Sequence, residues 1–201
     1  MAYNAPKAPA RFEQEIKRSR FIGVALPVST FEELEAQLER IRREFRDATH
    51  HCWASVIGNP DAGPRMRFDD AGEPGGTAGK PILGVLQHRA VEDALVVVVR
   101  YFGGVKLGAG GLVRAYSGTA SRVLDLVELV TVTPRSDLGI VIDYGDESAA
   151  RRILDQLGIG IDSVDYGDSV AIRVRVSEGA NEALTRELLE HTSGRARLLP
   201  Y

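Results

Sequence analysis

Apolar residues recur at three- and four-residue steps in one early segment, and this spacing predicts an amphipathic helix over residues 29–47. The segment 11–28 before it alternates loosely and contains β-branched residues, so it is expected to form a strand. Strand patterns follow at 50–58 and 65–70, and the second is expected to be the hairpin partner of the first. The stripe of the predicted helix consists of Phe31, Leu34, Leu38, Ile41 and Phe45.

The run 94–102 is almost continuously apolar, which is typical of a strand covered on both faces. Helices are expected before it at 82–93 and after it at 112–129. Glycine-rich loops precede both helices, at 71–81 and at 103–111. The first part of the chain therefore alternates strands and helices around one buried strand.

A different order of elements follows a proline at position 134. The pattern there reads strand, helix, strand, strand, helix, strand in fewer than 70 residues, which indicates a ferredoxin-like βαββαβ domain. The sequence thus predicts an α+β protein of two domains, residues 1–134 and 135–201.

Composition narrows the class of protein. Hydrophobic residues make up 44% of the chain, which is enough for a packed core. The single cysteine, Cys52, allows no internal disulfide and suits a reducing compartment. The beginning of the chain lacks an apolar stretch of signal-peptide length, and the longest apolar run is too short to span a bilayer. We therefore expect a cytoplasmic protein that is not in a membrane.

Charge is distributed unevenly along the chain. The formal charge is +2 through Arg135 and −5 after it, so the two domains are expected to present different surfaces. The basic excess of the first part is smaller than that of a dedicated DNA-binding protein.

The glycine-rich loops are the main candidates for binding chemistry. A turn without Cβ atoms lets backbone amides approach a ligand, and the start of the following helix carries partial positive charge that favours anions. Neither loop matches a nucleotide-binding fingerprint, and tight turns with close packing explain the glycines equally well. The predicted phosphate- or nucleic-acid-binding residues are Lys80, Arg100, Gly103, Gly104, Lys106, Gly108, Gly110, Gly111 and Arg114.

Acidic residues near the first loop are candidates for a metal site. Asp69, Asp70 and Glu73 offer carboxylates of the kind that Mg²⁺ prefers, although a strand end with a loop entry is the simpler interpretation. His50 and Cys52 share a strand face, but one cysteine does not make a zinc site and core packing is favoured. No catalytic residue and no cofactor are predicted.

Aromatic residues beside the second loop suggest base stacking. Tyr101 and Phe102 are candidates for this role. Tyr116 is in register with the apolar positions of its helix and is assigned to the core. His88 and Arg89 are expected to extend the same cationic surface.

Two stretches, RFDDAGEPGGTAGKPIL and VVRYFGGVKLGAGGLVRAY, resemble the YigZ/IMPACT family. The stretches KRSRFIG and HHCWASVIG add to the resemblance, which covers residues 11 to about 132 as the N-terminal domain of that family. The remainder is similar to the C-terminal domain of the bacterial members. Gly75 stands where the family commonly has serine, and Val105 and Ala109 stand where it commonly has threonine.

The resemblance implies a fold like the second domain of ribosomal protein S-five for the first part. It implies a fold like the fifth domain of elongation factor G for the second part. Both folds recur in translation, and eukaryotic members regulate translation through a protein partner. Fold analogy of this kind gives only a direction for function.

These observations lead to three hypotheses for function. The first is a non-enzymatic, translation-associated regulator that binds RNA or a ribosomal element through the glycine loops and nearby cations. The second is a Mg²⁺-dependent enzyme acting on a small phosphorylated or nucleotide ligand. The third is a protein-interaction module that binds a regulatory protein without nucleic acid.

Overall fold

The computed structural model describes residues 2–59 and 63–200. The chain falls into two compact units, which divide between Val132 and Thr133. The outer ends of the predicted domains, Met1 and Tyr201, lie outside the described residues. Within the described ranges, none of the helices has both the length and the apolar character needed to cross a membrane.

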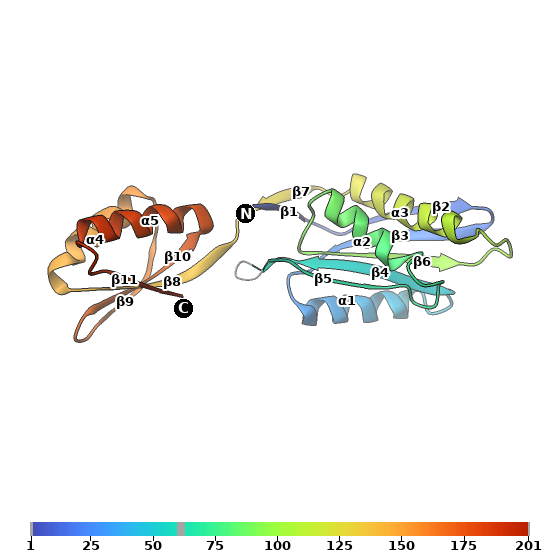
Figure 1. The fold of residues 1–201 in the computed structure, drawn as a ribbon. Coiled ribbons are helices and arrows are strands. Elements are labelled where there is room, and N and C mark those ends of the chain that lie inside the picture. The colour runs from blue at the N-terminus through green and yellow to red at the C-terminus, as the bar shows by residue number, and fades with distance from the viewer. Residues whose placement is uncertain (1, 60–62, 201) are drawn as a thin grey trace. The chain divides into compact units, whose positions relative to one another are not determined.

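The first unit is built on a five-stranded antiparallel sheet with the strand order β2-β3-β6-β4-β5 (Figure 1). The central strand β6 contains the apolar run, and its residues from Ala94 to Val99 are fully buried. The prediction of a strand covered on both faces is therefore confirmed. The strands are β2 (Ala10–Ile16), β3 (Ser19–Pro27), β4 (His50–Ile57), β5 (Arg65–Asp69) and β6 (Ala94–Tyr101).

Helices cover both faces of this sheet (Figure 1). Helix α1 (Phe31–Glu44) packs its apolar stripe on one face, while α2 (Gly79–His88) and α3 (Ala109–Asp125) pack on the other. The start of α1 is capped, because Thr30 Oγ1 accepts a hydrogen bond from the backbone N–H of Glu33.

Two features of this unit differ from the sequence prediction. The segment 11–28 was expected to be one strand, but it forms the hairpin of β2 and β3. Its turn places Lys17 and Arg18 at φ angles of 47° and 64°, without the Asn-Gly pair that usually marks such a turn. The pattern also missed a two-stranded sheet that joins β1 (Tyr3–Pro6) to β7 (Leu129–Val132).

The second unit has the predicted βαββαβ order. Its four strands form an antiparallel sheet with the order β11-β8-β10-β9, and two helices contribute to the core on one face. The α+β class predicted from the sequence is thus confirmed. The elements are β8 (Arg135–Ile142), the short 3-10 helix η1 (Tyr144–Asp146), α4 (Glu147–Gln156), β9 (Ile161–Tyr166), β10 (Val170–Ser177), α5 (Glu178–His191) and β11 (Arg197–Pro200).

Candidate functional site

The start of α3 is an open helix terminus. Gly108 precedes the helix with a φ of 72°, a left-handed conformation that favours glycine. No described side chain accepts a hydrogen bond from the N–H groups of Ala109, Gly110 or Gly111. The partial positive charge of the helix terminus therefore remains uncompensated there.

A pocket of about 420 Å³ lies at this terminus. Its rim carries Lys106 and Phe102, which are both exposed; 47% of Phe102 is accessible to solvent. Its floor contains the buried residues Glu73, Arg100 and Leu112. The full lining is Thr49, His50, Glu73, Pro74, Arg100, Phe102, Lys106, Leu107, Gly108, Ala109 and Leu112.

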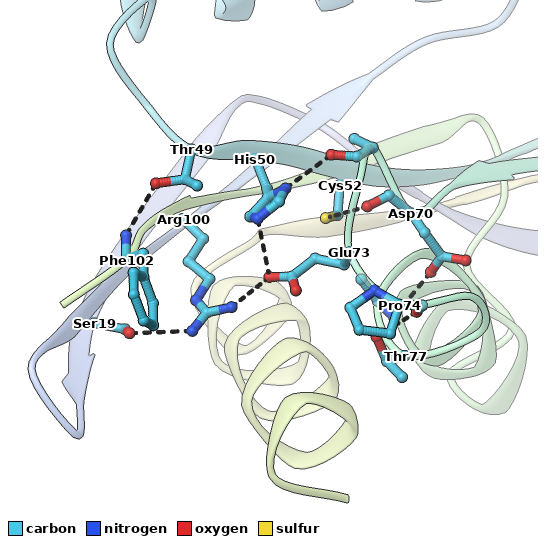
Figure 2. Close-up of polar contacts among 12 residues, drawn as sticks. Ser19, Thr49, His50, Cys52, Asp70, Glu73, Pro74, Thr77, Arg100 and Phe102 are labelled. Atoms are coloured by element: carbon cyan, nitrogen blue, oxygen red, sulfur yellow. Dashed lines mark hydrogen bonds and ion pairs between the residues drawn. The ribbon is translucent and has the colours of Figure 1, made fainter. Parts of the chain in front are cut away.

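A buried ion pair forms the polar part of the floor (Figure 2). Arg100 Nη1 donates to Glu73 Oε1 at 2.6 Å, and the two side chains are only 5% and 3% exposed. Tyr116 donates its hydroxyl to the same Glu73 oxygen at 2.7 Å, and Arg100 Nη2 donates to Ser19 Oγ at 3.2 Å. Because Glu73 and Arg100 neutralise each other, Lys106 and the helix terminus determine the sign of the pocket's charge.

His50 lies beside this pair and faces the pocket (Figure 2). Its Nδ1–H donates to the carbonyl oxygen of Ala71 at 2.9 Å, which in the neutral ring leaves the lone pair on Nε2. His50 Nε2 is 3.9 Å from Glu73 Oε1. His50 therefore adds a ring nitrogen to the wall of the pocket.

Two further ionisable groups near the floor stay protonated at neutral pH. Burial, followed by the neighbouring Cys52 and Glu73, raises the pKa of the Tyr116 hydroxyl. Burial also raises the pKa of the Cys52 thiol to about 12. The thiol donates to the carbonyl oxygen of Asp70 at 3.0 Å, so Cys52 has the environment of a structural cysteine rather than a nucleophile.

The start of α2 is closed by the chain's own carboxylate. Asp70 accepts hydrogen bonds from the backbone N–H groups of Gly76, Ala78 and Gly79 at distances of 2.7 to 2.9 Å. Burial raises the pKa of Asp70, but the three N–H groups outweigh burial and lower the pKa overall. The first glycine loop therefore holds an internal anion where an external one was predicted.

The structure does not bring the three predicted magnesium ligands together. Asp70 binds the start of α2, Glu73 pairs with Arg100, and Asp69 accepts from the backbone N–H of Ala71 at 2.7 Å. Among the described residues, no group of three His, Cys, Asp or Glu side chains is arranged to hold a metal ion.

The glycines of the second loop have different structural roles. Gly103 is required by packing, because a Cβ atom there would lie 1.8 Å from the carbonyl oxygen of Arg18. Gly111 packs against Leu107, whereas Gly104 and Gly110 are exposed. The packing interpretation therefore applies to Gly103 and Gly111, and the anion-binding interpretation concerns the open stretch from Gly108 to Gly110.

The predicted cations do not all line the same pocket. Lys106 lies on the rim of the pocket, and Arg100 lies in its floor. Arg114 lines a separate hollow of about 160 Å³ together with Lys17. Lys80 is exposed in the first turn of α2 and does not line the pocket.

A larger hollow of about 610 Å³ lies between α2 and α3, and its lining includes His88, Arg89, Ser117 and Ser121. Arg89 donates to Ser121 and to Asp125, and Ser117 donates to a backbone carbonyl of its own helix. Because Arg89, Ser117 and Ser121 already have partners, the hollow is a weaker candidate than the pocket at α3.

Sequence reasoning assigned His50 to core packing and did not place it beside Arg100. Strands β4 and β6 are neighbours, and their register places His50 directly opposite Arg100. The two-residue alternation puts His50 and Cys52 on one face, but it does not reveal which strand lies beside them. A correct assignment of strand order would have placed His50 beside Arg100.

Comparisons with known proteins agree with the fold. The Impact N-terminal domain matches residues 17–124, and a domain of unknown function, DUF1949, matches residues 140–195. An IMPACT family member of Haemophilus influenzae is 38% identical over 193 residues, covering 96% of this chain and 94% of that protein. The IMPACT family member YigZ of Escherichia coli is 37% identical over 194 residues, covering 96% and 95%.

A solved structure described as a hypothetical protein is similar along the whole chain. It has 36% sequence identity and a TM-score of 0.71, and the match covers 100% of this chain and 97% of that one. Both domain matches and the full-length relatives lead to the same assignment. The chain therefore belongs to the IMPACT family, as a YigZ-type member with an Impact N-terminal domain and a DUF1949 C-terminal domain.

Proposed function

We propose that the protein is a non-enzymatic, cytoplasmic, translation-associated regulator that binds RNA or a ribosomal element. In this proposal the pocket at α3 binds a phosphate group of the RNA. Phe102 on the rim offers a ring face for a neighbouring base. Lys106 supplies a mobile cation at the same rim.

The observation that carries the proposal is the contrast between the two helix termini that follow glycine loops. The N–H groups of α2 are occupied by Asp70, whereas those of α3 have no described side-chain acceptor and lie beside Lys106. Anions bind favourably at helix starts when the N–H groups are free. The neutralised floor removes the main local source of repulsion for an incoming phosphate.

Binding of a labelled, mixed-sequence single-stranded RNA to the full chain tests the proposal. We expect Lys106→Glu to weaken binding strongly, because it places a carboxylate at the phosphate position. Lys80→Glu is the matched control, since it makes the same charge change at a terminus already occupied by Asp70. A plot of log affinity against log salt concentration should have a slope of about −0.7 for each neutralised phosphate.

Circular dichroism and thermal unfolding should show that both variants remain folded. Equal losses in the two variants would indicate general charge attraction and would contradict a site at α3. Binding that does not depend on salt would contradict phosphate recognition.

A second candidate function is an enzyme acting on a small phosphorylated or nucleotide ligand. The observation that favours it is His50, which lines the pocket with its Nε2 3.9 Å from Oε1 of the buried Glu73. Thermal-shift titration with nucleotides, with and without Mg²⁺, followed by an assay for released phosphate, separates the two candidates. Turnover that is lost in His50→Gln would favour the enzyme, whereas RNA affinity without turnover would favour the regulator.

A further inference from the structure

Two tyrosines on the second unit form an exposed aromatic pair. Tyr144 begins η1 and Tyr166 ends β9, and they are 55% and 60% exposed. Their ring centroids are 6.3 Å apart and their planes differ by 17°. Large aromatic rings that remain in water are enriched at sites of protein recognition.

Hydrogen bonds hold both rings in place. Tyr144 donates its hydroxyl to the carbonyl oxygen of Gly167 at 2.7 Å, and Tyr166 donates to Glu147 Oε1 at 2.9 Å. Arg151 donates both to Glu147 Oε1 at 2.8 Å and to the Tyr166 hydroxyl at 3.2 Å. Because the rings are already ordered, a partner that packs on them loses little side-chain entropy.

The segment that carries the pair is strongly acidic. Residues 143–168 contain seven Asp or Glu residues and two arginines, a net charge of −5. Asp168 follows Tyr166 closely in the chain, is exposed, and forms no ion pair with another described residue. Asp143, which precedes Tyr144, has Arg195 Nε at 3.6 Å. Asp165 is also exposed, but consecutive strand residues point to opposite faces, so it does not share the face of Tyr166. The surface therefore combines ordered rings with the unpaired carboxylate of Asp168, in a segment of net negative charge.

We propose that the tyrosine–acid surface, defined as Asp143, Tyr144, Tyr166 and Asp168, docks an arginine-bearing basic segment of a protein partner. A guanidinium stacks on a tyrosine face and at the same time donates to a carboxylate, so both features of the surface are used. Nucleic acid has the wrong charge for this surface. The proposal concerns the second unit alone and does not depend on RNA binding at α3.

Fluorescence anisotropy of a labelled twelve-residue peptide of alternating arginine and glycine, titrated with the full chain, tests the proposal. Tyr144→Ser/Tyr166→Ser removes both rings without changing the charge and should weaken binding about tenfold. Asp143→Asn/Asp168→Asn should also weaken binding. Its matched control, Glu182→Gln/Glu190→Gln, makes the same charge change on exposed positions of α5 and should have little effect. Unchanged affinity in the tyrosine variant would overturn the proposal.

NMR chemical shifts of the backbone amides of the wild-type chain give a second measurement that does not depend on any variant. The peptide should shift the amides of residues 143–147 and 164–168. Shifts located elsewhere would overturn the proposal. Larger shifts of the same residues with single-stranded RNA would assign the surface to nucleic acid instead, and shifts that change with protein concentration alone would assign it to a second copy of the chain.

Discussion

The two glycine loops of the first unit lead into helices that begin in opposite electrostatic states. Helix α2 starts on the carboxylate of Asp70, which occupies three backbone N–H groups. Helix α3 starts at Gly108 with no described side-chain acceptor and with Lys106 beside it. Two loops of similar composition therefore lead into different helix starts: the N–H groups of α2 are satisfied internally, and those of α3 are accessible.

The difference arises from what precedes each loop. Asp70 follows the edge strand β5 and reaches over its own loop, whereas Glu73, the carboxylate that lines the pocket at the start of α3, is bound by Arg100. A glycine loop is thus an anion site only where no neighbouring acid reaches the helix. Removing these acids or their partners, or adding a new acid, tests this explanation.

The largest expected effect comes from Arg100→Met, which removes the cation that neutralises Glu73. Breaking a buried ion pair from one side leaves a buried charge without a partner and costs about 3–5 kcal/mol of unfolding free energy. Denaturant unfolding measures the loss. In the folded fraction the pocket should also bind RNA less tightly, because Glu73 then repels phosphate as Asp70 does at α2.

Two comparisons sharpen this result. The double variant Arg100→Met/Glu73→Gln should be less destabilised than the sum of the two single variants, since neither charge remains. Arg175→Met breaks the pair with Asp137, in which both side chains are about half exposed, and should cost no more than about 1 kcal/mol. Similar costs for Arg100→Met and Arg175→Met would show that the pocket floor is not a buried ion pair in solution.

An intermediate effect is expected from Asp70→Ala, which opens the start of α2. The variant loses hydrogen bonds from a charged group to three backbone N–H groups, and we expect a loss of about 2 kcal/mol in unfolding free energy. If free N–H groups are what an anion needs, inorganic phosphate should stabilise this variant more than it stabilises Asp70→Asn, whose amide oxygen can still accept from the helix. Equal phosphate effects on the two variants would contradict that explanation.

The pH dependence of the same change has a defined sign. The fold lowers the pKa of Asp70, so its ionised form contributes stability above the ordinary carboxyl pKa of about 3.9. That contribution is lost as the pH falls through the lower pKa of the folded state. The difference in unfolding free energy between wild type and Asp70→Asn should therefore be constant from pH 5 to 7 and shrink below about pH 4. A difference that grows on acidification would contradict the lowered pKa.

The sequence predicted the type of each main element better than it predicted which elements lie side by side. Local patterns identified α1 from its apolar stripe, the buried strand β6 and the ferredoxin-like order of the second unit. The pairing of β1 with β7 was not predicted, because residues so far apart leave no periodic signal. The turn at Lys17 and Arg18 was missed because the surrounding hairpin imposes a backbone conformation that these residues do not favour.

The same limit applies to the candidate site. The loop with Lys106 and Gly108 was identified from glycine content and from the helix that follows it. That Glu73 pairs with Arg100 depends on the sheet bringing β4, β5 and β6 together. The bonds of Asp70 to the start of α2 are local, but the sequence pattern does not show how the loop folds back over this carboxylate. The sequence therefore indicated two equivalent loops, and the folded conformation of the first one made them different.

The smallest expected effect on stability comes from Ala109→Asp, which gives α3 an acid like the one at α2. Ala109 is exposed at the first position of the helix, where a carboxylate interacts favourably with the free N–H groups and the helix dipole. We expect the unfolding free energy to rise by about 0.3–1 kcal/mol. RNA affinity should fall at the same time, because the new carboxylate occupies the place proposed for the phosphate.

Leu126→Asp is the matched control, since it adds the same charge to an exposed position at the opposite end of α3. There the carboxylate meets the negative end of the helix, so stability should not rise, and RNA affinity should be nearly unchanged. The opposite signs of the effects on stability and binding are what distinguish an open anion site from a merely uncapped helix. If Ala109→Asp stabilised the protein without weakening RNA binding, the start of α3 would be an unsatisfied terminus with no part in recognition.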